Sequence, residues 1–168
     1  MDIREAILAE HSSHQTAKIV RYVGSDAGRF AELMGLFTGT DRRVMQRSSW
    51  AVGNCVESHP ELADPYYALL FRMLERTDTH IAVKRNVVRL MQFVNVPSRH
   101  RGRVFDVCCS LVGDPTEPVA VRSFALTAAA RIARDLPDLM AELRLAATRY
   151  PEADTPGFKA RRRNVLGV

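Results

Sequence analysis

The chain has 168 residues and a formal net charge of +5, with 46% hydrophobic and 26% charged residues. This length fits one domain with its own core, and the composition excludes a fibrous chain and intrinsic disorder. The mild positive charge favours acidic or polyanionic partners. We therefore expect a soluble, folded protein with a single domain over residues 1–168.

The sequence gives no sign of secretion or of membrane insertion. No apolar stretch approaches the roughly 20 residues that a membrane span needs. The first residues, MDIREAILAEH, carry acids where a secretory signal would carry a basic region and an apolar core. Cys55, Cys108 and Cys109 are an odd number of cysteines in apolar segments, unlike a secreted disulfide framework. We expect a cytoplasmic protein, not bound to membranes, with reduced and buried thiols.

Apolar periodicity predicts helices along the whole chain and no strand. Asp2 can cap a first short helix, and Ser12 or Ser13 can begin a second one that Gly24 ends. Turn residues such as Gly113-Asp114-Pro115 separate the later helical segments. The expected helices span residues 3–11, 14–23, 27–38, 42–57, 61–76, 80–94, 98–112, 118–134, 138–149 and 156–166.

A sequence pattern recurs about every 38 residues. The equivalent positions, 38, 38 and 39 residues apart, are Gln46, Lys84, Arg122 and Arg161. A proline follows the first three of them by 14, 13 and 15 residues, at Pro60, Pro97 and Pro137. Proline is tolerated in the first turn of a helix, so each one suits the start of a new helix. The repeating element is therefore a pair of helices.

These helix pairs resemble HEAT or armadillo repeats, which carry an Asp in the turn and a Val-Arg or Val-Lys at the start of the second helix. The matching stretches are Asp78 to Val83-Lys84 and Asp114 to Val121-Arg122, with weaker copies at Asp154 to Ala160-Arg161 and Asp41 to Met45-Gln46. The resemblance covers residues 26–166. It implies an all-α fold, an α-α superhelix, in which residues 1–24 form capping helices and residues 25–168 form about four hairpins of a right-handed solenoid.

The resemblance also implies that the second helices line the concave side of the solenoid. Most of the basic charge falls on these helices. The candidate binding residues on them are Arg47, Lys84, Arg85, Arg89, Arg122, Arg161 and Arg162. A stripe of cations attracts anions, so we expect an acidic protein or peptide segment as the partner, with nucleic acid as the alternative. Whether the protein forms a homodimer stays open.

A structural role competes with this hypothesis. In HEAT-like repeats the basic residue that begins the second helix commonly contacts the turn Asp of its own or the next unit. The resemblance thus implies that Asp78 and Asp114 neutralise Lys84 and Arg122. We favour this ladder for Lys84 and Arg122, and the stripe hypothesis applies most directly to Arg47, Arg85, Arg89 and Arg162.

Trp50 is the single tryptophan, and it aligns with Val88, Leu126 and Val165 in the other repeats. Large apolar residues at a repeated helical position usually pack in the core. We therefore expect Trp50 to be a core residue rather than a stacking platform.

The sequence carries no motif for catalysis, such as a Gly-rich phosphate loop, a nucleophile elbow or paired carboxylates. His11 and His14 have no third ligand nearby, and Cys108-Cys109 lacks the spacing that binds zinc. The resemblance extends to DNA glycosylases built from HEAT-like repeats, but the second helices offer almost no acid for such a site. We expect a non-enzymatic interaction protein without cofactor or metal, and a glycosylase is the less favoured alternative.

Overall fold

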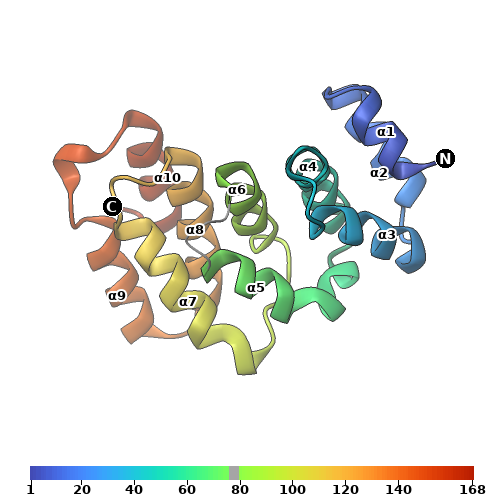
Figure 1. Ribbon diagram of the computed structural model, residues 1–168. Coiled ribbons are helices and arrows are strands. Elements are labelled where there is room, and N and C mark those ends of the chain that lie inside the picture. Colours follow the sequence, from blue (N-terminus) through green and yellow to red (C-terminus); the bar gives the residue numbers. More distant parts are fainter. Residues whose placement is uncertain (76–79) are drawn as a thin grey trace. The chain divides into compact units, whose positions relative to one another are not determined.

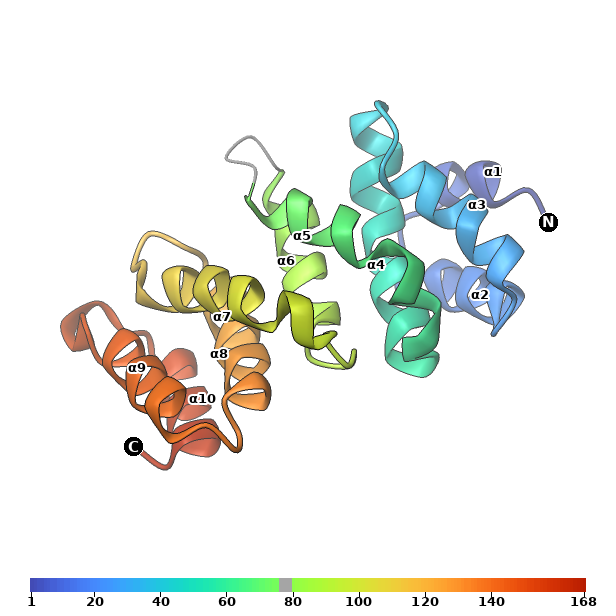
Figure 2. The same ribbon diagram turned by 90° about the horizontal axis from the view of Figure 1, so that it is seen from below.

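The described residues, 1–75 and 80–168 of the computed structural model, form helices and their connections (Figures 1 and 2). The chain divides into two compact units, Met1–Val94 and Asn95–Val168, here called unit 1 and unit 2. The expected all-α fold class is confirmed. The expectation of a single domain stays a prediction. No helix in the described ranges is both long and apolar enough to cross a membrane.

The predicted helices are confirmed along both units. Unit 1 contains α1 (Ile3–Ala9), α2 (Ser13–Val23), α3 (Ala27–Phe37), α4 (Arg42–Ser58), the 3-10 helix η1 (Pro60–Tyr66), α5 (Tyr67–Glu75) and α6 (Ile81–Leu90). Unit 2 contains α7 (Ser98–Gly113), α8 (Val119–Ile132), α9 (Pro137–Ala147), the 3-10 helix η2 (Pro151–Ala153) and α10 (Pro156–Leu166). Most ends lie within two residues of the predicted ones.

Two helix boundaries differ from the prediction for local reasons. The segment predicted to be helical from residue 61 begins as η1, and α5 starts only after Pro65, because proline lacks an N–H and disrupts the α-helical bonding pattern. Helix α6 ends at Leu90 rather than at residue 94. Beyond it, the amides of Gln92 and Phe93 bond to carbonyls three residues back, which tightens the chain into a turn.

Helix α4 is the centre of unit 1, because it packs against α1, α2, α3, η1 and α6. Small buried residues on α4 let α6 come close. Ser49 Oγ accepts a 3.0 Å hydrogen bond from Asn86 Nδ2, and a Cβ added to Gly53 would lie 3.4 Å from Arg89 Nη1. Since α2 and α6 both pack on α4, these three helices lie side by side (Figures 1 and 2).

In unit 2, α8 packs against α7, α9 and α10. Its core is filled by large, fully buried side chains, among them Phe105, Leu126, Leu143 and Phe158. A Cβ added to Gly157 would lie 3.8 Å from Val119 Cγ2, so the beginnings of α8 and α10 lie next to each other.

Side-chain caps fix where the helices of unit 1 begin, as the sequence indicates. The side chain of Asp2 accepts a hydrogen bond from the amide of Glu5, and Ser12 Oγ accepts one from that of Gln15. Gly24 ends α2 with a φ of 53°, a conformation that favours glycine. Asp41 caps α4 by accepting from the amides of Arg43 and Val44 at 3.0 and 3.2 Å.

Replacing the Asp41 cap tests how much the central helix depends on it. We expect Asp41→Ala to lower the free energy of unfolding by about 1 kcal/mol, because two amides of the first turn lose their acceptor. Asp41→Asn keeps an acceptor and should stay close to the wild type in urea unfolding. An equal loss in both variants would instead assign the effect to the exposed ion pair between Asp41 and Arg4.

Candidate functional site

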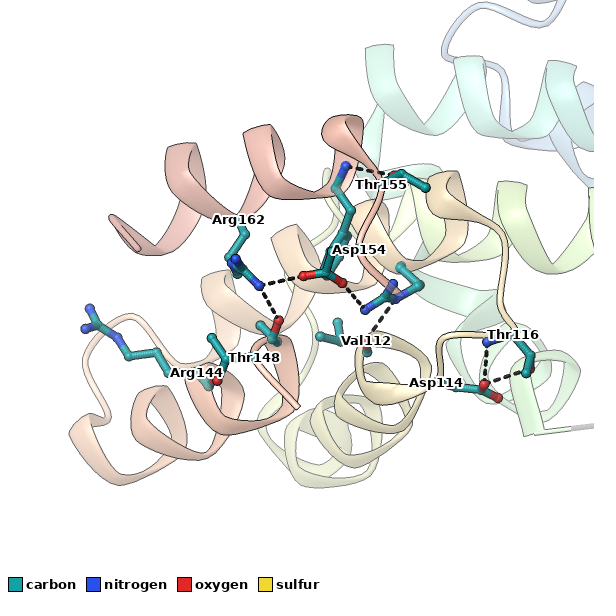
Figure 3. A network of polar contacts seen from close by, with 11 residues as sticks. Val112, Asp114, Thr116, Arg144, Thr148, Asp154, Thr155 and Arg162 are labelled. Atoms are coloured by element: carbon teal, nitrogen blue, oxygen red, sulfur yellow. Dashed lines mark hydrogen bonds and ion pairs between the residues drawn. The ribbon is translucent and has the colours of Figure 1, made fainter. Parts of the chain in front are cut away.

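One buried carboxylate joins two predicted binding residues of unit 2 (Figure 3). Asp154 lies between η2 and α10, and only 1% of its side chain is exposed. Its Oδ1 accepts from Arg122 Nη2 at 3.0 Å, and its Oδ2 accepts from Arg162 Nη1 at 2.6 Å. Charge-assisted hydrogen bonds of this kind are stronger than neutral ones, so both guanidinium groups are held inside the unit.

The same two arginines also bind the ends of the preceding helices. Arg122 Nε donates to the Val112 carbonyl in the last turn of α7, and Arg162 Nη1 donates to the Ala147 carbonyl at the end of α9, both at 3.0 Å. Arg122 also lies over the Phe158 ring, with Cζ 3.9 Å from its centroid. Carbonyls in the last turn of a helix lack intrahelical partners and carry partial negative charge. The arginines therefore serve as caps for α7 and α9.

The ladder expected for Arg122 is present, but its partner is the turn Asp of the next repeat, and the pairing with Asp114 is wrong. Arg122 binds Asp154, in the turn of the following hairpin. Asp114 Oδ1 instead accepts from the amide and the hydroxyl of Thr116, at 2.8 and 2.7 Å. Asp114 thus stabilises its own turn. The other predicted partner, Asp78, lies outside the described residues, so its pairing with Lys84 stays a prediction.

Two predicted residues of unit 1 are also engaged internally. Arg47 Nη1 donates to the carbonyls of Ile7 and Leu8 at the end of α1, at 3.3 and 3.0 Å. Arg89 Nη1 donates to Asn54 Oδ1 at 2.7 Å, and its Nη2 forms an ion pair with Glu57. Both arginines are half-buried. They hold α4 to α1 and to α6.

The predicted stripe therefore separates into two sets. Arg47, Arg89, Arg122 and Arg162 bind groups of their own unit, and Arg122 is only 4% exposed, so its guanidinium lies in the interior. Lys84 is half-buried and takes part in an interaction of its own. Arg85 is exposed and Arg161 half-exposed, and neither is paired within the described ranges.

Sequence reasoning missed the other exposed cations on α2, α4, α8 and α10, the second helices of their pairs. They are Lys18, Arg21, Arg42, Arg43, Arg131, Lys159 and Arg163. The sequence signal for them is the scarcity of acids on these helices. Within the described residues, Glu57 is the one acid on α2, α4, α6, α8 and α10.

The three cysteines are free and buried, as the sequence predicted. Burial raises the pKa of each thiol to about 12. They are protonated at neutral pH, whereas a nucleophilic cysteine acts as a thiolate. An open pocket of about 290 Å³ in unit 2, lined by Cys109, Gly113, Arg149, Tyr150 and neighbouring residues, contains none of the predicted binding residues. The described residues hold no group of three or more His, Cys, Asp or Glu placed for a metal ion.

Removing the Asp154 charge tests whether this carboxylate holds unit 2 together. We expect Asp154→Asn to lower the free energy of unfolding by about 3–5 kcal/mol, because the buried Arg122 and the half-buried Arg162 lose their counter-ion. Asp138→Asn removes an exposed acid on α9 of the same unit and should change the free energy of unfolding by less than about 0.5 kcal/mol. Urea unfolding followed by circular dichroism measures both, and equal midpoints for the two variants would contradict this role.

The comparisons with known proteins agree with the helix pairs described above. A family model described as HEAT repeat domain matches residues 3–168. No curated protein and no solved structure matches the chain. Members of this family are helical repeat proteins that typically take part in protein interactions and generally act as non-enzymatic scaffolds. Because the match spans nearly the whole sequence and the structure has the expected helices, the chain belongs to the HEAT repeat family.

Proposed function

We propose that this protein is a non-enzymatic scaffold that binds an acidic segment of another protein through its basic faces. The basic face of unit 1 comprises the exposed cations of α2, α4 and α6, which are Lys18, Arg21, Arg42, Arg43 and Arg85. The basic face of unit 2 comprises the exposed cations of α8 and α10, which are Arg131, Lys159 and Arg163, together with the half-exposed Arg161. The typical role of the family in protein interactions supports a protein partner. A cytoplasmic location belongs to the same proposal.

One observation carries this proposal. The five helices of the basic faces hold a single acid, Glu57, within the described residues, and Arg89 already neutralises it. The other helices each carry at least one acid, for example Glu32 on α3 and Glu142 on α9. The charge of the basic faces is therefore not compensated locally. Such faces raise the local concentration of an anionic ligand and speed its association.

Helix α10 shows how the internal and exposed cations are combined. Its four cations include Arg162, which Asp154 and the Ala147 carbonyl hold in place. Lys159 and Arg163 are exposed one turn apart, since they are spaced i, i+4 on the helix. The fixed Arg162 thus orients a helix that presents its remaining cations to solvent.

Charge reversal on α10 tests the proposal. Fluorescence anisotropy of a labelled Glu-Ser repeat peptide at low salt measures the affinity of the wild type and of Lys159→Glu/Arg163→Glu. We expect the double variant to weaken binding by about tenfold, because attraction at this face becomes repulsion. Added salt should weaken wild-type binding as well.

A control variant with the same change in net charge distinguishes the effect of charge on this face from the effect of the protein's total charge. Arg72→Glu/Arg144→Glu reverses two exposed cations on α5 and α9, outside the basic faces. This control should retain affinity to within about threefold, since distant exposed charges are screened. An equal loss in both double variants, or no binding by the wild type, would overturn the proposal. Preference for a labelled DNA duplex, with a steep salt dependence, would assign the faces to nucleic acid instead.

A further inference from the structure

Trp50 differs from the residues at the equivalent positions of the next two repeats, whereas Val165 of the last repeat is half-buried like Trp50. Val88 and Leu126 are fully buried, at 0% exposure, whereas Trp50 is half-buried on α4. The sequence-based expectation of a core residue therefore holds for only part of the ring. The indole N–H donates to no group among the described residues. A buried Trp N–H usually has a hydrogen-bond partner, so this donor is available at the surface.

The surroundings of the indole are held by contacts within unit 1. The ring of His11 meets the indole edge-on, with the centroids 6.2 Å apart. Arg47, one turn before Trp50, is tied to the carbonyls of α1, and Asn54, one turn after it, accepts from Arg89. A surface whose neighbours are already fixed loses little conformational entropy on binding, which favours affinity.

Trp50 also lies next to Arg85, one of the cations of the basic face of unit 1. The hydrogen bond between Ser49 and Asn86 places these two residues opposite each other on α4 and α6. Trp50 follows Ser49 and the exposed Arg85 precedes Asn86, so these two residues lie at neighbouring positions on adjacent helices. Tryptophan and arginine are among the residue types that most often dominate binding energy at protein interfaces.

We propose that Trp50 is the apolar anchor of the basic face of unit 1, and that the segment bound there has an apolar side chain beside its carboxylates. This inference rests on the proposed function, because it specifies the acidic segment. The apolar side chain covers the exposed part of the indole, a backbone carbonyl accepts from the indole N–H, and a neighbouring carboxylate pairs with Arg85. A segment of acids alone would satisfy Arg85 but leave the apolar ring in water.

Because Trp50 is the only tryptophan, its fluorescence reports on this surface directly. Two peptides of equal length and charge serve as probes, one with a central Leu between glutamates and one with Ser in its place. We expect the Leu peptide to bind roughly tenfold more tightly, because it buries apolar surface on the indole. It should also shift the Trp50 emission to shorter wavelength and reduce quenching by acrylamide.

Two variants test whether the Trp50 ring causes the difference in affinity between the Leu and Ser peptides. Trp50→Ala should abolish the difference between the peptides in an anisotropy assay with labelled probes. Tyr22→Ala, which truncates another half-buried aromatic side chain of unit 1, should retain the difference. The quenching experiment uses the wild-type protein, so it decides the matter even where Trp50→Ala does not fold.

The outcomes separate this inference from the function on which it rests. If both peptides bind equally and the Trp50 emission does not respond, the anchor is excluded and the acidic segment stands. If neither peptide binds, the proposed function itself fails. If a single-stranded oligonucleotide quenches Trp50 while neither peptide alters its emission, base stacking on the indole replaces the apolar anchor.

Discussion

The arrangement of unit 2 depends on the carboxylate of Asp154, which two arginines share in the interior. A buried charge is costly unless other groups compensate it, and here each oxygen of the carboxylate accepts from a different guanidinium. Because Arg122 belongs to α8 and Arg162 to α10, the carboxylate ties these two helices together. The helices can present exposed cations because this internal contact fixes where they lie.

The same chemistry recurs where a second helix contacts the end of an earlier one. Arg47, Arg122 and Arg162 each donate to carbonyls in the last turn of another helix, namely α1, α7 and α9. The partial negative charge of a helix end makes an arginine on the neighbouring helix a favourable cap. Much of the basic character of the second helices thus stabilises the repeats. The residual exposed cations are the ones that carry the proposed function.

Local signals in the sequence were sufficient for the helices and many of their caps, including Asp2, Ser12 and Gly24. The partner of Arg122 was not predictable in this way, because Asp114 and Asp154 both lie in turns before a second helix. Burial distinguishes them, and burial depends on how α10 packs on α8. Likewise, repeat alignment placed Trp50 in the core, but the contacts around α4 leave part of its ring exposed.

The central claim is that the arginines of the second helices form an internal set and an exposed set. Exchange of the arginine Nε–H protons with water, measured by NMR on the intact protein, tests it most directly. The Arg122 Nε–H, which bonds to the Val112 carbonyl within a side chain 5% exposed, should exchange much more slowly than those of Arg85 and Arg163. Exchange at Arg122 as fast as at Arg85 would contradict the claim.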